Sequence, residues 1–273
     1  MTLAAADPAY RAGEQEWRRK RQIDLVADEG WTTVAGLFWL KEGRNTFGSA
    51  PSNDIVFPAS APAHAGYFHH RAGRTTMRLA SQTTDVELKH DTPGPPNVIT
   101  LGDLSFFMIL RNDRHAIRLR DRNSRYRREF AGLHWYPIHE RWRVKGRFTP
   151  YPSPKSVSIP TILGYSDIMT SPGVVSFRLN GKEVKLEPVS AGDRLWFIFR
   201  DQTSGRKTYG AGRFLYADAP KDGVVTLDFN RAYNPPCAYT PYATCPLPPK
   251  QNHLLAPVEA GERNYHYKES DKP

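Results

Sequence analysis

A mainly β fold, with one helix near its N-terminal end, is the prediction that this 273-residue sequence supports. From residue 31 onward, short apolar runs are separated by Gly, Pro, Asn and Asp, which is typical of antiparallel strands joined by turns. Only residues 8–28 have helical features. We expect an N-terminal helix (1–30), a β-sandwich-like half (31–115) and a C-terminal antiparallel sheet or barrel (116–273) with a long Pro-rich loop. The two halves are also compatible with one continuous domain.

The predicted helix has a clear start and stop. Pro8 suits a first helical turn, and Gly30 follows the last turn. We expect Trp17 and Leu25 to dock this helix on the body of the protein. The charged run over residues 18–21 is expected to face the solvent.

The C-terminal strands have the strongest local pattern. Residues 174–189 read as a hairpin, because alternating apolar residues flank Asn180-Gly181, a pair that suits a type I′ turn. Further strands are expected at 194–201, 207–217 and 223–230. In the last of these, a period of two places Asp228 and Asn230 on one face, opposite an apolar face. Residues 149–173 contain five prolines and are expected to form a connecting arm with a single strand around 156–161.

A Pro-rich segment follows the last strand and is expected to form the wall of a site. Seven of the 23 prolines lie between Pro235 and Pro257, and both cysteines, Cys237 and Cys245, lie there too. A loop of this length without regular periodicity is usually functional or disordered, and its interleaved aromatic residues disfavour disorder. Prolines restrict the backbone, so we expect a rigid loop that folds back over the polar face of the last strand.

Charge and hydropathy limit the partners. The net charge of +10 favours anionic partners, but the basic residues are scattered and no nucleic-acid motif accompanies them. We expect a small-molecule ligand of anionic character, no specific nucleic acid and no membrane. No apolar run approaches the ~20 residues of a membrane span, and no signal-peptide pattern opens the chain, so a cytoplasmic location is expected. The oligomeric state is left open.

Several chemistries compete for the polar residues. A cysteine nucleophile, a disulfide and a buried apolar role are all open for Cys237 and Cys245. Their spacing with His253 lacks the close pair of a zinc knuckle, so neither a metal nor a cofactor is expected. The motifs of α/β hydrolases, P-loop enzymes and Rossmann dehydrogenases do not occur. Polar residues near the strand ends could instead form a pocket, or Asp201 could be a turn residue while Asp228 and Arg213 form a cross-strand ion pair.

Three stretches of the sequence carry a family resemblance. They are GLFWLKEGRNTFGSAPSNDIVFP, RDQTSGRKTYGAGRFLYADAP and VTLDFNRAYNPPCAYTPYATCPLPPKQNHLLAPVEAGERNY. Together they resemble the bacterial domain of unknown function family 1684 over about residues 17–265. The resemblance implies no particular reaction.

The leading functional hypothesis is a hydrolytic small-molecule enzyme with its pocket between the C-terminal sheet and loop 233–262. The alternative is a non-catalytic binding module for an anionic ligand or partner. An enzyme needs titratable groups that converge on one place, whereas a binding module needs only arginines and backbone donors. The candidate catalytic residues are Asp228, Cys237 and Glu262. The candidate ligand-binding residues are Asp201, Tyr209, Arg213, Asn230, Asn234, Cys245 and Asn252.

Overall fold

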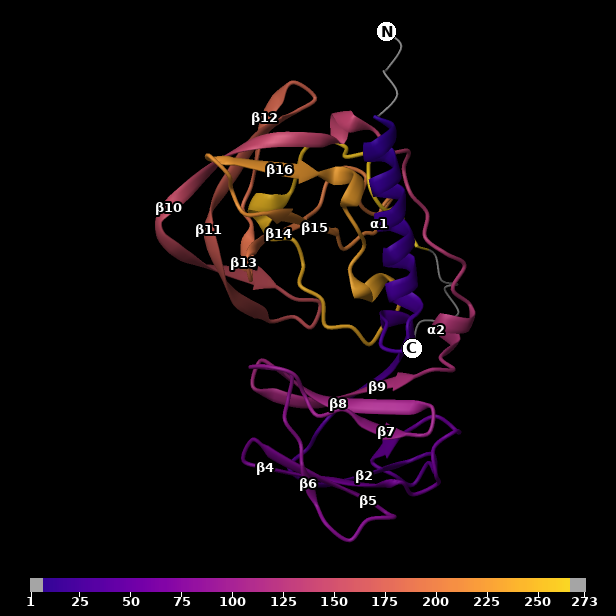
Figure 1. Cartoon of the computed structure of the whole chain (residues 1–273). Coiled ribbons are helices and arrows are strands. Elements are labelled where there is room, and N and C mark those ends of the chain that lie inside the picture. Colours follow the sequence, from indigo (N-terminus) through magenta and orange to yellow (C-terminus); the bar gives the residue numbers. More distant parts are fainter. Residues whose placement is uncertain (1–6, 266–273) are drawn as a thin grey trace. The chain divides into compact units, whose positions relative to one another are not determined.

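The computed structural model of this chain describes residues 7–265, and the chain divides into two compact units (Figure 1). The N-terminal unit comprises residues 24–130. The C-terminal unit comprises the described residues up to Ile23 and from Ala131 onward. The prediction of a mainly β protein with one N-terminal helix and antiparallel sheets is confirmed.

The N-terminal unit is a sandwich of two sheets. One sheet has the strand order β1-β9-β8-β7 and the other the order β3-β2-β4-β5-β6. Phenylalanines from both sheets, among them Phe47, Phe68 and Phe106, meet in the core between them. The strands are β1 (Val34–Trp39), β2 (Gly43–Gly48), β3 (Ile55–Val56), β4 (Gly66–Arg71), β5 (Arg74–Leu79), β6 (Val86–Glu87), β7 (Ile99–Leu101), β8 (Leu104–Arg111) and β9 (Arg114–Asp121).

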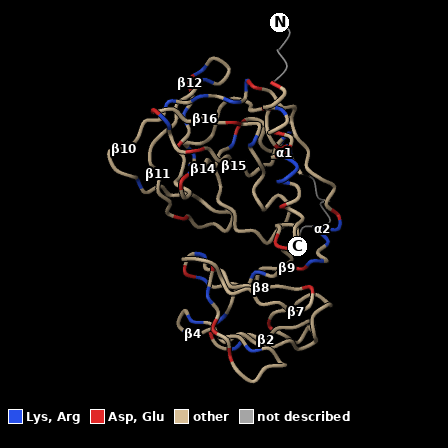
Figure 2. Tube along the Cα trace, in the orientation of Figure 1, with Lys and Arg blue, Asp and Glu red and all other residues tan. Residues whose placement is uncertain are grey.

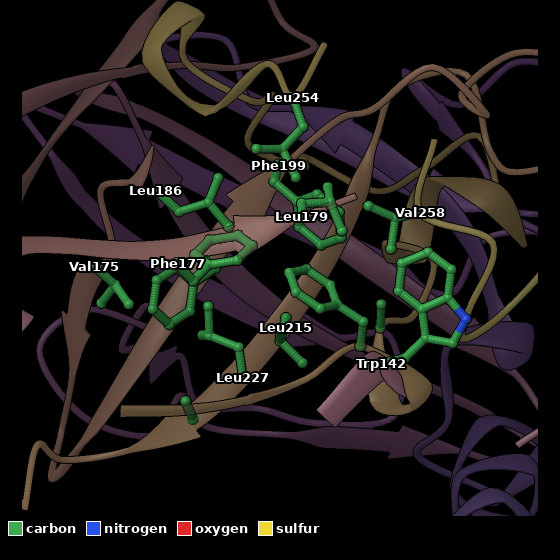
Figure 3. Close-up of a cluster of buried hydrophobic side chains, with 14 of the residues drawn as sticks. Trp142, Val175, Phe177, Leu179, Leu186, Phe199, Leu215, Leu227, Leu254 and Val258 are labelled. Carbon is green, nitrogen blue, oxygen red and sulfur yellow. The ribbon is translucent and has the colours of Figure 1, made fainter. Parts of the chain in front are cut away.

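The C-terminal unit contains two further antiparallel sheets, with strand orders β12-β11-β10-β16 and β13-β14-β15. Apolar residues that alternate along their strands, such as Phe177, Phe199 and Leu215, pack together with Trp142 and Val258 in the main core (Figure 3). The strands are β10 (Arg143–Pro160), β11 (Ser166–Leu179), β12 (Lys182–Leu186), β13 (Val189–Ala191), β14 (Arg194–Phe199), β15 (Arg213–Asp218) and β16 (Val224–Asp228).

The prediction of a connecting arm over residues 149–173 is wrong. Residues 143–160 form the single long strand β10, which pairs with β11 on both sides of an irregularity between Pro150 and Lys155. The prolines are tolerated because they cluster where the register shifts and ladder hydrogen bonds are not required. The hairpin at Asn180-Gly181 is confirmed, with both residues in the left-handed region at φ of 51° and 78°.

Helix α1 (Pro8–Val26) is the long helix of the described chain, and a second, short helix α2 spans Arg125–Arg128. Leu25 is buried, as expected. Trp17 is half-buried and lies edge-on to Trp135. The charged run does not all face solvent, because the side chain of Arg21 is only 16% exposed. The helix therefore brings charge into the C-terminal unit.

Candidate functional site

The Pro-rich loop is ordered and largely buried, and it contains no strand. Short 3-10 turns at Phe229–Arg231, Pro236–Ala238 and Lys250–Asn252 give it its shape. Prolines precede or begin the second and third of these turns, where their fixed φ fits the backbone. The loop therefore presents a defined set of polar groups.

Glu262 is the centre of the first polar group, and it is fully buried. Its carboxylate accepts hydrogen bonds from Arg21 Nε at 2.9 Å and from Asn234 Nδ2 at 2.8 Å. The hydroxyl of Tyr239 donates to the same carboxylate. Burial, followed by the charge of Glu262, raises the pKa of Tyr239 well above its usual value. The result is an ion pair whose carboxylate has partners on both oxygens.

Gly261 explains how Glu262 is placed. Its φ is +76°, and a Cβ atom there would lie 2.4 Å from the carbonyl oxygen of Ala232. Glycine permits both the left-handed backbone and the close approach. The amide of Glu262 consequently donates to that Ala232 carbonyl at 2.8 Å.

Asp228 and Asn230 form a second group. Asp228 Oδ2 accepts a hydrogen bond from the hydroxyl of Tyr10 at 2.7 Å, and Asp228 Oδ1 accepts from Asn230 Nδ2 at 3.0 Å. Asn230 also exchanges hydrogen bonds with the backbone of His139, at 3.0 and 3.1 Å. Burial and the Asp228 carboxylate together raise the pKa of Tyr10. Asp228 and Asn230 therefore share one hydrogen-bond network. The sequence predicted that the Pro-rich loop would cover this polar face, but the side chain that reaches Asp228 is Tyr10 of α1.

Arg213 and Asp201 form a third group, and both side chains are fully buried. Arg213 Nη2 donates to Asp201 at 2.7 Å and to the carbonyl of Val258 at 2.9 Å. The other Asp201 oxygen accepts from the amide of Thr203 at 2.8 Å and its hydroxyl at 2.7 Å. Asp201 is thus a turn residue and an ion-pair partner at once. The cross-strand pair with Arg213 involves Asp201, whereas the sequence suggested Asp228.

Cys237 and Cys245 lie next to each other. The backbone amide of Cys237 donates to the Cys245 sulfur at 3.2 Å, and the hydroxyl of Tyr209 donates to the Cys237 carbonyl at 3.0 Å. A hydrogen bond with the Cys245 thiol lowers the pKa of Cys237, although burial opposes the shift. No disulfide joins the two side chains, and both are buried.

Asn252 belongs to none of these groups and forms hydrogen bonds of its own from the third 3-10 turn of the loop. Its Nδ2 donates to the carbonyls of Glu187 at 2.9 Å and Ile198 at 3.0 Å, and its Oδ1 accepts from the amide of Glu187 at 2.8 Å. These bonds attach the third 3-10 turn of the loop to the sheet of β13, β14 and β15. No other predicted site residue takes part in them.

The structure therefore brings the candidates together in small sets only. Glu262 joins Asn234, Asp228 joins Asn230, Asp201 joins Arg213, and the two cysteines join Tyr209. Asp228, Cys237 and Glu262 belong to three different sets, and their assignment as catalytic residues stays a prediction. Within residues 7–265, no three His, Cys, Asp or Glu side chains are placed to hold a metal ion.

Sequence reasoning missed an aromatic stack on the face of β14 and β15 opposite the main core, where a smaller apolar cluster that includes Val157 and Ile159 of β10 also packs. Trp196 and Tyr216 are cross-strand partners with ring centroids 5.9 Å apart, and Tyr233 stacks on Tyr216 at 6.3 Å. The guanidinium carbon of Arg194 lies 4.3 Å from the Tyr216 ring centre, and that of Arg21 lies 4.2 Å from the Tyr233 ring centre. The period of two along β14 could have revealed this stack, because residues of the main core alternate there with Trp196 and Ile198 on the opposite face.

Lys and Arg are spread along the chain and are not confined to one segment. Figure 2 shows Lys and Arg along the whole trace, interleaved with Asp and Glu. The expectation that no specific nucleic acid binds stays a prediction. No helix in the described part of the chain is long and apolar enough to cross a membrane.

Comparisons with known proteins give a family and no activity. Residues 128–263 match the family model described as Protein of unknown function (DUF1684). The chain is also similar to an uncharacterized protein from Haloarcula marismortui, whose structure was solved by solution NMR. Identity is 32%, the match covers 50% of this chain and 78% of that one, and the TM-score is 0.43. No curated protein matches the chain.

Proposed function

The chain belongs to the DUF1684 family of proteins of unknown function, and on that premise we propose that its C-terminal unit binds a small, planar, anionic ligand without transforming it. The binding face consists of Trp196, Tyr216, Tyr233 and Arg194, and is called the aromatic face below. It adjoins the start of loop 233–262, where a ligand was expected from the sequence. The proposal follows the binding-module alternative, now with named residues.

The observation that carries the proposal is an unpaired donor beside stacked rings. Trp196 Nε1 is buried and finds no hydrogen-bond partner among the described residues. A buried donor without a partner costs about 1–3 kcal/mol, so an acceptor at this position would relieve a real penalty. The neighbouring rings of Trp196, Tyr216 and Tyr233 are only half-buried, which leaves aromatic surface for a planar group.

The charge on this face selects an anion. Arg194 is exposed and forms no ion pair within residues 7–265; Asp218 opposes it in the strand register without pairing. The second arginine, Arg21, is already neutralised by Glu262. Arg194 is therefore the cation that a carboxylate or sulfonate would meet, close to the indole donor of the same strand.

The buried networks argue against catalysis at the predicted residues. Asp228 and Glu262 each hold hydrogen bonds from several partners, and those partners differ between the two. General acid–base chemistry requires a group within reach of the reacting atom. A binding role needs no such convergence.

The test compares two probes that differ in charge alone. By isothermal titration calorimetry, 2-naphthoate should bind the protein and the uncharged 2-naphthamide should bind at least about 10-fold more weakly, since a hydrogen bond to a charged group contributes about 1.5–3 kcal/mol. Arg194→Gln should remove that preference, and Trp196→Phe should weaken both probes. Arg178→Gln, an exposed arginine on β11, is the matched control. Equal binding of both probes, or an equal loss in Arg178→Gln, would refute the proposal.

A hydrolytic function has one supporting observation, the lowered pKa of Cys237. A thiolate is the reactive form of cysteine, so this residue is the nucleophile that such an enzyme would use. Steady turnover of p-nitrophenyl acetate that disappears in Cys237→Ser would favour this second candidate. A single stoichiometric burst without turnover would count against it.

A further inference from the structure

We propose that Cys237 and Cys245 form a dithiol which a hydroperoxide converts into a reversible intramolecular disulfide, so that the Pro-rich loop is a site of oxidative modification. These are the two cysteines of the chain. Neither belongs to the aromatic face, so the proposal stands apart from the ligand-binding function.

The geometry needed for a disulfide is nearly in place. The two thiols are within hydrogen-bonding reach of each other. The Cys245 sulfur lies 3.2 Å from the Cys237 amide nitrogen, and adding an N–Cα bond of about 1.46 Å puts it within about 4.7 Å of the Cys237 Cα atom. A disulfide bond is about 2.05 Å long, and with the Cys245 sulfur this close to the Cys237 backbone, rotation of the Cys237 side chain can bring the two sulfurs together.

The loop around the cysteines is held at both ends. Tyr209 donates to the carbonyl of Cys237, and the amide of Ile162, in the turn between β10 and β11, donates to the carbonyl of Cys245 at 3.0 Å. Cys237 also lies in the 3-10 turn that begins at Pro236. These anchors keep the two thiols together, whereas in a free nine-residue segment they would meet only occasionally.

The two cysteines have different roles in the reaction. Cys237 is the attacking residue, because the hydrogen bond with the Cys245 thiol favours its thiolate. The thiolate attacks one peroxide oxygen, the O–O bond breaks, and Cys237 becomes a sulfenic acid while hydroxide or alkoxide leaves and takes up a proton. The Cys245 sulfur then attacks the Cys237 sulfur and displaces water. Overall, two thiols lose two electrons and two protons, and the peroxide is reduced to water, or to water and an alcohol.

Burial determines which oxidants can react. The residues Cys237 and Cys245 are 5% and 4% exposed. A molecule as small as hydrogen peroxide can enter such a site by local fluctuation of the loop, whereas a bulky disulfide such as oxidised glutathione is disfavoured. The expected product is consequently the internal disulfide, and mixed disulfides should be rare.

The experiment treats the folded full-length protein with hydrogen peroxide, blocks remaining thiols in denaturant and digests with trypsin. Both cysteines fall in the single peptide 232–250, because Arg231 and Lys250 are successive cleavage sites. We expect this peptide to lose two hydrogen atoms, about 2 Da, to resist alkylation, and to recover both thiols on reduction. Closing this loop should also raise the melting temperature by about 5 °C.

Two variants separate the roles. Cys245→Ser should stop at a sulfenic acid on Cys237 that dimedone traps, with no rise in melting temperature. Cys237→Ser should leave Cys245 oxidised much more slowly. Independent sulfenic acids on both wild-type cysteines, disulfide-linked dimers, or full alkylation after treatment would each overturn the proposal. The wild-type measurement decides the matter even if a variant does not fold.

Discussion

At the scale of single residues, the chain places several charges in its interior beside partners of opposite charge. Arg213 is among the largest fully buried side chains of residues 7–265, and Asp201 neutralises it from 2.7 Å. Such a pair contributes modestly compared with an apolar replacement of both residues, but removing one member leaves a buried charge alone. Arg213 and Asp201 are therefore expected to be structural, and the ligand-binding role predicted for them is a separate question that mutants can answer.

Arg213→Met should lower the free energy of unfolding by about 3–5 kcal/mol, because Asp201 then remains buried without its cation. Urea denaturation followed by circular dichroism measures this. The double variant Asp201→Asn with Arg213→Met should lose less than the sum of the two single variants, since the partners are coupled. Simple additivity would show that the pair does not act as a unit.

The sequence could identify which residues share a strand face, and it could not identify their partners. The period of two correctly put Val225 and Leu227 in the core and Asp228 away from it. The partner of Asp228 is Tyr10, 218 positions earlier in the chain. No local spacing rule links such positions, because packing of α1 on the unit creates the contact.

At the scale of elements, α1 contributes polar and charged side chains to the buried networks of the C-terminal unit. Its inward face supplies Tyr10 to Asp228, Glu14 to Arg231 and Arg21 to Glu262. Pro8 and Gly30 predicted the helix and its approximate limits from the sequence. The burial of Arg21 could not be predicted in this way, because a basic run on an amphipathic helix most often faces water.

Two arginines on α1 allow a matched comparison. Arg21→Met should cost about 3–5 kcal/mol of unfolding free energy, since Glu262 loses the cation that compensates its burial. Arg19→Met should change stability little, because Arg19 pairs with Glu16 at the exposed surface and its side chain is 64% accessible. Chemical denaturation of both variants tests this; similar losses would mean that Glu262 does not depend on Arg21.

At the scale of the whole molecule, the two units are expected to respond to opposite extremes of pH. Among residues 7–265, the tyrosines with a clearly raised pKa all lie in the C-terminal unit, and Tyr151, whose pKa burial and a hydrogen bond to Glu187 raise to about 12, is one of them. The others are Tyr10, Tyr136, Tyr216, Tyr233 and Tyr239. The His115 pKa, in contrast, is lowered, and His115 lies in the N-terminal unit.

Alkaline conditions should therefore destabilise the C-terminal unit. A raised folded-state pKa means that the unfolded chain loses its tyrosine protons first, near pH ~10. Stability is complete below that pH and falls as pH rises above it. Absorbance at 295 nm should show the buried tyrosines ionising together with unfolding; ionisation of all tyrosines near pH 10 in a folded protein would contradict this.

Acid should instead act on the N-terminal unit through His115. Its ring lies 4.9 Å from that of His70 and 5.4 Å from that of His90, and its Nε2 atom is left without a hydrogen-bond partner by the described residues. Burial, then the neighbouring imidazoles, disfavours its protonation and lowers its pKa. Because the folded pKa is below the unfolded value of about 6.5, its contribution is present above pH ~6.5 and is lost as pH falls.

The free energy of unfolding of the wild type should consequently decrease between pH 7.5 and 5.5, and His115→Gln should reduce that decrease, since a neutral amide carries no proton linkage. His69→Gln is the control, because His69 is exposed on the same β4 as His70. Urea titrations at both pH values, with hydrogen exchange read separately over residues 24–130, measure the change. An unaltered pH dependence in His115→Gln would show that acid acts elsewhere. A reduced dependence confined to this range would show that the two β units titrate independently.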